Sequence, residues 1–181
     1  MSREVREFIK ETVSIIVIAF ILAMILRHFV VEGRIIPTPS MVPTIQIKDR
    51  VMVCKFIYYF KDPQRGDIVV FDPPEVIHSD DDYIKRVIGL PGETVEMKNG
   101  RVYVDNRALN EPYLPESLNY NYGPVTVPQD GLLVLGDNRN HSFDSHMWNA
   151  WLTQDRIKGK AFMTYWPLNR IKLLEREVSI E

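Results

Sequence analysis

The sequence is poor in several features that define whole classes of protein. Its 181 residues include one cysteine, Cys54, so no disulfide can form within the chain. Lys and Arg number 22 against 24 Asp and Glu, and this balance, without a basic patch, argues against nucleic-acid binding. Internal repeats and low-complexity tracts are absent, and no long helical pattern follows residue 50. The length therefore suits one domain, or one domain with an appendage.

One long apolar run is present near the N-terminus. Residues 13–26 are apolar except Ser14, and as a helix they cover about 21 Å of the roughly 30 Å lipid core. A helix that is apolar on all sides would need complete burial in a soluble protein, so we favour a membrane span. No small-x-small cleavage pattern follows, which indicates a retained anchor, and the preceding basic residues place the N-terminus in the cytoplasm. The predicted segments are a cytoplasmic N-terminus (1–11), a transmembrane anchor (12–31) and an extracytoplasmic β domain (32–181).

The chain after residue 50 has the pattern of an antiparallel β protein. Short runs rich in Val, Ile, Tyr and Phe alternate with Gly, Pro, Asp and Asn, and we predict strands at 50–56, 67–71, 83–89, 94–106, 125–127, 132–137 and 159–166. Asn99-Gly100 lies between two alternating runs and predicts a hairpin. Residues 106–124 have the composition of an irregular loop. The fold class is therefore mainly β, with a single N-terminal helix followed by an antiparallel β-barrel-like domain.

A single serine, Ser40, stands among prolines in "PTPSMVPT" a few residues after the apolar segment. A nucleophilic serine needs a base within hydrogen-bonding reach. His141 with Asp144 is one option, as a Ser-His-Asp triad. Lys85 is another, because burial on its apolar strand would favour the neutral amine. Residues alternate along a strand, so Lys85 shares a face with Val87; the alternative is that Lys85 is a solvated charge on an edge strand.

The stretch "GDNRNHSFDSH" (136–146) is dense in polar side chains. Asp137, His141, Asp144 and His146 are of types that bind zinc or manganese, but their spacing matches no strong metal signature. A polar turn is the simpler interpretation. We expect neither a metal nor an organic cofactor.

Four stretches together resemble type I signal peptidases, the membrane-anchored Ser/Lys endopeptidases. "PSMVPT" (39–44) is similar to the nucleophile box and "RGDIVVF" (65–71) to the strand box that follows it. "YIKRVIGLPGE" (83–93) resembles the box with the general base, and "GDNRNHSFDS" (136–145) the last box. They occur in the family's order after an anchor, and the resemblance covers essentially the whole chain.

The resemblance implies a role for each matching residue. Ser40 is the nucleophile, Lys85 the neutral general base, Thr38 an oxyanion-hole hydroxyl, and Ser142 the hydroxyl that orients the lysine. Structural supports around them are Pro43, Asp137, Asn138, Arg139 and Asp144. The candidates for lining substrate pockets are Ile36, Pro37, Met41, Ile45, Tyr83 and Ile84. His146 departs from the pattern, because many relatives have arginine there.

The implied activity is cleavage of signal peptides from exported preproteins after Ala-x-Ala-like sites. The implied partners are preproteins and membrane lipid, with the enzyme a monomer in the cell membrane and a small inserted subdomain at about residues 98–130. A self-cleaving Ser/Lys protease and a non-catalytic anchored β-domain that binds a partner are the alternatives. A run of five apolar or aromatic residues, 56–60, predicts side chains that face lipid headgroups.

Overall fold

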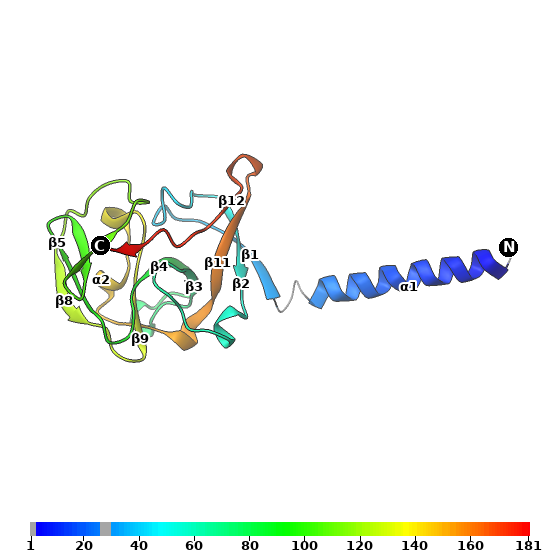
Figure 1. Ribbon diagram of the computed structural model, residues 1–181, viewed down its shortest axis with the longest axis horizontal. Helices are drawn as coiled ribbons and strands as arrows, with labels where there is room; N and C mark the ends of the chain where they lie inside the picture. Colours follow the sequence, from blue (N-terminus) through cyan, green and yellow to red (C-terminus); the bar gives the residue numbers. More distant parts are fainter. Residues whose placement is uncertain (1–2, 26–29) are drawn as a thin grey trace.

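The N-terminal helix lies apart from the β-strands (Figure 1). The computed structural model describes residues 3–25 and 30–181, and its first element is helix α1 (Arg3–Ile25). The apolar side chains of α1 are exposed, among them Phe8 at 70% and Phe20 at 65%. Within the described residues, no helix is both long and apolar enough to cross a membrane. Residues 26–29 of the predicted anchor, and residues 1–2, lie outside the described residues, and Val31 begins a strand.

The larger sheet holds eight antiparallel strands among the described residues and is curled (Figure 1). Their order is β1 (Val31–Ile35), β2 (Arg50–Cys54), β11 (Ile157–Trp166), β3 (Ile68–Phe71), β4 (Tyr83–Gly89), β9 (Gly131–Leu135) and β10 (Leu152–Thr153), with β12 (Lys172–Leu173) beside β11. Helix α2 (Ser145–Trp148) follows the polar stretch after β9. The predicted antiparallel, mainly β fold is confirmed.

A second, smaller sheet overlaps the predicted inserted subdomain. Its order is β13 (Ser179–Ile180), β7 (Arg107–Asn110), β6 (Arg101–Val104), β5 (Thr94–Lys98) and β8 (Tyr122–Thr126). The predicted hairpin joins β5 to β6, and Asn99 and Gly100 both have positive φ, as such a two-residue turn requires. The prediction of an irregular loop at 106–124 was wrong in part, because Asp105 and Asn106 form a second turn with positive φ that leads into β7.

Strand β4 is central and not at an edge, which removes the solvated-edge interpretation of Lys85. It pairs with β3 on one side, with Val69 opposite Lys85, and with β9 on the other. Both of its faces are covered, so six consecutive residues from Ile84 to Gly89 are buried. The alternation of side chains sends Ile84 into one apolar core and Val87 into another.

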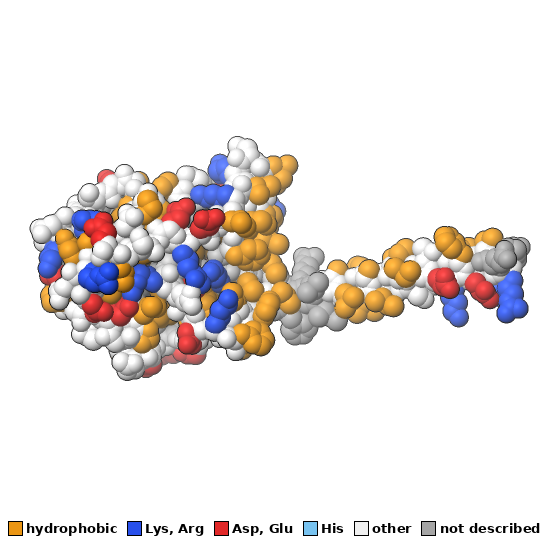
Figure 2. Space-filling model, viewed as in Figure 1, with side chains coloured by type: hydrophobic (Ala, Val, Ile, Leu, Met, Phe, Trp, Pro, Cys, Tyr) orange, Lys and Arg blue, Asp and Glu red, His pale blue; other side chains and the backbone are white. Residues whose placement is uncertain are grey.

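The end of the β structure nearest α1 carries a cluster of exposed apolar side chains (Figure 2). Ile35 and Trp166 both lie opposite Arg50 of β2, so they flank the same strand end. We call this surface the apolar rim; its members are Ile35, Trp166, Leu168, Ile171 and Leu173, which are 47–69% exposed. In the apolar and aromatic run 56–60, which follows β2 in the chain, Tyr59 and Phe60 are also exposed. The hydroxyl of Tyr58 instead donates to Asp67.

Candidate active site

The structure brings Ser40 and Lys85 together from distant parts of the chain. Lys85 Nζ donates to Ser40 Oγ at 2.8 Å and to the carbonyl oxygen of Ile84 at 3.0 Å. Ser40 is 6% exposed and Lys85 4% exposed. The hydroxyl of Thr38 lies 3.5 Å from Ser40 Oγ. A potential nucleophile, a potential base and a further hydroxyl therefore meet at one point.

The loop that carries Ser40 is held by its own turns and by the polar stretch after β9. Val42 N–H donates to Pro39 at 3.0 Å, and Ile45 N–H donates to Met41 at 2.9 Å. Asn138 binds the loop from outside: its N–H donates to the Ser40 carbonyl at 3.0 Å, and its side chain donates to Pro39 at 3.3 Å. Prolines restrict the backbone on either side of the serine. The loop is thus ordered before any substrate arrives.

Burial changes the chemistry of Lys85. Removal from water lowers the pKa of its amine from 10.5 to about 8, and the negative charges of Asp144 and Asp137 oppose that shift. At pH 7 roughly a tenth of such an amine is neutral, against less than a thousandth for an ordinary lysine. A neutral amine 2.8 Å from a serine hydroxyl can accept its proton.

A cleft of about 270 Å³ opens onto this pair. Three of the candidates for lining substrate pockets, Pro37, Tyr83 and Ile84, line this cleft, and Phe143 forms part of its wall. The other three candidates, Ile36, Met41 and Ile45, are at most 3% exposed and pack in the core with Val51 and Val53 of β2. These three support the nucleophile loop from below and do not reach the cleft.

Ser142 lies beside the site without the expected bond to the lysine. Its hydroxyl is buried and has no hydrogen-bond partner among the described residues, and the second bond of Lys85 goes to Ile84 instead. Ser142 and the Ser40 backbone both pack against Gly136. If residue 136 had a side chain, its Cβ would lie 2.3 Å from Ser142 Oγ and 2.4 Å from the Ser40 carbonyl oxygen. Only a glycine allows these two serines to approach from opposite sides.

The histidine alternatives are not assembled in this geometry. Asp144 accepts from Gly136 N–H at 2.9 Å and lies 2.6 Å from His146 Nδ1, so its carboxylate does not orient His141. His141 lines the cleft, with Nδ1 3.3 Å from Asn138 Oδ1. Among the described residues, no three His, Cys, Asp or Glu side chains are grouped as metal ligands would be.

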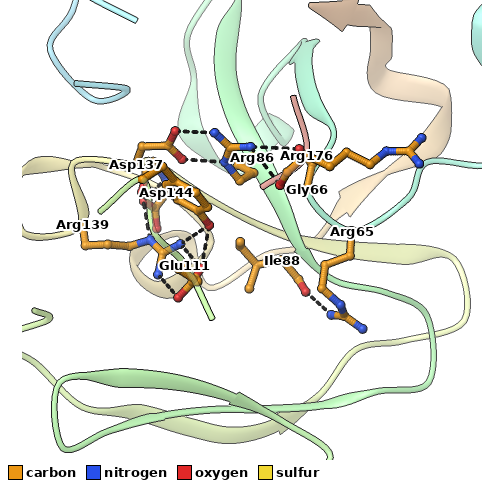
Figure 3. Close-up of polar contacts among 11 residues, drawn as sticks. Arg65, Gly66, Arg86, Ile88, Glu111, Asp137, Arg139, Asp144 and Arg176 are labelled. Atoms are coloured by element: carbon orange, nitrogen blue, oxygen red, sulfur yellow. Dashed lines mark hydrogen bonds and ion pairs between the residues drawn. The ribbon is translucent and has the colours of Figure 1, made fainter. Parts of the chain in front are cut away.

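Figure 3 shows two buried ion pairs, one of which involves Arg86, the neighbour of Lys85 in the chain. Arg86 donates to both oxygens of Asp137, at 2.9 and 2.7 Å, and its other nitrogen donates to backbone carbonyls that include Gly66 at 3.1 Å. Arg139 donates to Glu111 at 3.0 and 2.5 Å. Both arginine side chains are fully buried. Through these ion pairs, Asp137 and Arg139 connect residues 136–145 to β4 and to Glu111, which directly follows β7.

Comparison with known proteins shows which family the chain resembles. A family model described as signal peptidase, peptidase S26, matches residues 9–166. The chain belongs to this family. A probable signal peptidase I-2 from Synechocystis is 46% identical over 168 residues, covering 91% of this chain and 77% of the relative. Signal peptidase I S of Bacillus subtilis is 35% identical over 178 residues, covering 92% and 94%. A solved signal peptidase I from Enterococcus faecalis is 36% identical, has a TM-score of 0.46, and covers 55% of this chain and 97% of that chain.

Membership in the signal peptidase family confirms the resemblance and the predicted enzyme class. The chain is a hydrolase of the serine endopeptidase type. The four stretches that carry the resemblance all lie within the matched residues.

Sequence reasoning missed several residues around this signal peptidase site. Arg86 was not among the predicted site residues, and Glu111 and Tyr113 fell in the stretch predicted to be an irregular loop (106–124). Tyr113 contacts both arginines: its ring lies 4.0 Å from the Arg86 guanidinium, and its hydroxyl accepts from Arg139 at 3.2 Å. A charged residue next to Lys85 on an apolar strand was the one available signal, since buried charges need partners.

Proposed function

We propose that this protein removes signal peptides from exported preproteins with a Ser40/Lys85 dyad. The observation that carries the proposal is the 2.8 Å contact between a buried lysine amine and a buried serine hydroxyl at the end of a cleft. Membership in the signal peptidase family supplies the substrate class. No metal or organic cofactor takes part in the proposed reaction.

The proposed reaction begins with the neutral Lys85. Its amine takes the proton of Ser40 as Oγ attacks the scissile carbonyl. The ammonium then gives that proton to the leaving amine, and an acyl-enzyme ester remains on Ser40. Water then attacks the ester while Lys85 takes one of its protons. Lys85 returns that proton to Ser40 Oγ as the ester C–O bond breaks, and the peptide acid is released. The same lysine serves as acid and base, because its pKa of about 8 lies near neutral pH.

The oxyanion formed in each attack is stabilised by two donors. Ser40 N–H and the Thr38 hydroxyl are the candidates, and Thr38 Oγ1 lies 3.5 Å from Ser40 Oγ. Loss of one such donor typically raises the barrier by about 3–4 kcal/mol. The donors sit on the pre-ordered loop, so little reorganisation accompanies the reaction.

The cleft favours small residues next to the cut. Pro37, Tyr83 and Ile84 are among the residues that line its volume of about 270 Å³ beside the dyad. This agrees with substrates of the Ala-x-Ala type, whose side chains are single methyl groups. Met41 and Ile45 pack in the core beneath the nucleophile loop and support it.

We also propose that the protein acts at a membrane. Residues 13–26 form an apolar run interrupted only by Ser14, and basic residues precede it, which favours a cytoplasmic N-terminus. The apolar rim lies on the end of the β structure nearest α1 (Figure 2). In full-length protein reconstituted with brominated lipids, we expect tryptophan quenching that falls in a Trp166→Phe variant. Equal quenching in the variant would place the rim in water.

The dyad is tested by cleavage of a preprotein by the detergent-solubilised chain. We expect cleavage after an Ala-x-Ala site by the wild type, and loss of cleavage in Ser40→Ala and in Lys85→Ala. Lys48→Ala is a matched control, because that exposed lysine lies in the same loop region. Full activity of Lys85→Ala would refute the dyad. An inactive wild type would favour a non-catalytic domain, and cleavage of its own chain alone would favour a self-cleaving protease.

A further inference from the structure

His146 is held on the far side of the acid that faces the dyad lysine. It lies in α2, its side chain is 14% exposed, and its Nδ1 is 2.6 Å from Asp144 Oδ1. A carboxylate can only accept, so Nδ1 carries the hydrogen of this bond. The ring stacks on Tyr120 with centroids 4.3 Å apart and planes 11° apart, and Tyr122 packs edge-on at 6.3 Å. The imidazole is thus fixed in both position and orientation.

Asp144 connects this histidine to the site. The carboxylate is completely buried, and its second oxygen accepts from Gly136 N–H at 2.9 Å. Gly136 is the residue on which Ser142 and the Ser40 carbonyl converge. The negative charge of Asp144 also reaches Lys85, where it favours the ammonium. A change in the position or charge of the pair formed by His146 and Asp144 would therefore alter the surroundings of Ser40 and Lys85.

We propose that His146 is a positioning residue: it fixes the Asp144 carboxylate through Nδ1–H, and its ring charge sets how much negative charge Asp144 presents to Lys85. This rests on the proposed function of Ser40 and Lys85. An imidazole can change charge within the range in which enzymes work. When the ring is neutral, the full charge of Asp144 favours the Lys85 ammonium. When the ring is protonated, it offsets that charge and favours the neutral amine.

The other acidic groups around this pair each have an arginine partner. Asp137 is matched by Arg86, and Glu111 by Arg139. Burial raises the pKa of the phenols of Tyr120 and Tyr122, which stay neutral.

Three substitutions separate charge from positioning. His146→Arg has a permanent positive charge and donors. His146→Gln keeps a donor without a charge. His146→Phe keeps a ring against Tyr120 and loses both. In all three, melting of the full chain in detergent identifies any variant that does not fold.

The measurement is kcat/KM for preprotein cleavage between pH 5.5 and 10. We expect the acid limb of His146→Arg to lie at least about half a pH unit below that of His146→Gln, with the wild type between them, since a nearby charge moves a pKa in this direction. We expect His146→Phe to lose about tenfold in kcat at every pH, and His146→Gln to retain most of it. If His146→Arg does not fold, the charge part of the proposal is tested by His146→Gln alone. The acid limb of that variant must then lie at a higher pH than the acid limb of the wild type.

The possible results separate the two proposals. Coincident limbs in active, folded variants overturn the charge part, and wild-type kcat in His146→Phe overturns the positioning part. Both leave dyad-dependent cleavage by the wild type intact. If the wild type does not cleave, or Ser40→Ala cleaves as well as the wild type, the proposed function itself fails.

Discussion

Replacing Lys85 with methionine measures how strongly the fold opposes a charge at the site. Methionine has a similar length and no charge, so it fills the same space between β3 and β9. The pKa of Lys85 is about 8 in the folded protein, against an ordinary value of 10.5. A difference of this size corresponds to about 3 kcal/mol. Folding at pH 7 therefore includes an unfavourable contribution from this one amine.

The sign follows from proton linkage. Below pH 8 the amine is charged in both the folded and the unfolded state, and the wild type carries the full penalty. Between pH 8 and 10.5 the unfolded chain binds the proton that the folded chain has lost, so the free energy of unfolding rises with pH. Relative to Lys85→Met, the wild type should gain about 2–3 kcal/mol between pH 7 and pH 10. The bonds of Lys85 to Ser40 and Ile84 add about 1 kcal/mol each, largely independent of pH.

The assay is urea unfolding of the full chain in detergent, followed by tryptophan fluorescence at pH 7 and pH 10. The matched control is Lys172→Met, because Lys172 is exposed on β12. Its stability relative to the wild type should not change by more than about 0.5 kcal/mol with pH. If the difference between wild type and Lys85→Met is the same at both pH values, the amine is not destabilised by burial, and the basis for a neutral Lys85 is lost.

Three further outcomes test the surroundings of the dyad. Asp137→Asn leaves the Arg86 guanidinium buried without its counter-ion, so the free energy of unfolding should fall by about 3–5 kcal/mol in urea titrations, and a loss below about 1 kcal/mol would contradict this. Gly136→Ala places a methyl group 2.4 Å from the Ser40 carbonyl oxygen, so kcat should fall about 100-fold, and wild-type kcat would show that the loop can yield. Thr38→Val should lower kcat by about 100- to 1,000-fold with little change in KM, because the lost donor acts on the oxyanion; an unchanged kcat would remove Thr38 from the oxyanion hole.

Much of the β structure could be predicted from local patterns. The strand at β4 and the Asn99-Gly100 hairpin were predicted because alternation and turn residues act over a few positions. The turn at Asp105 and Asn106 was missed, since its flanking run "RALN" lacks the bulky alternating residues that indicate a strand. Strand β7 forms because β6 and the C-terminal β13 pair with it, and those partners are distant in sequence or unmarked by pattern.

The substrate-pocket prediction shows a second limit of sequence reasoning. Ile36, Met41 and Ile45 belong to the same loop region as Pro37, and apolar residues there can face either the cleft or the core. The loop turns at Pro39 and Met41, and these turns direct Met41 and Ile45 into the core. Ile36 precedes the turns and is fixed instead by backbone hydrogen bonds with Lys48 and Asp49. Which side a loop residue faces depends on turns and neighbours, and no periodicity reports it.

The sequence by itself determined the signal peptidase family, the antiparallel β class and the two residues of the proposed dyad, because each has a local pattern or motif. Only the tertiary structure decided how those residues behave. The low pKa of Lys85 requires β3 and β9 on either side of β4 and Ser40 above it, and the sequence shows none of these as neighbours. The charge that opposes it comes from Asp144, which is 59 positions away and is held by Gly136 and His146. Desolvation and charge act through space, so the chemistry of the amine is a property of the fold.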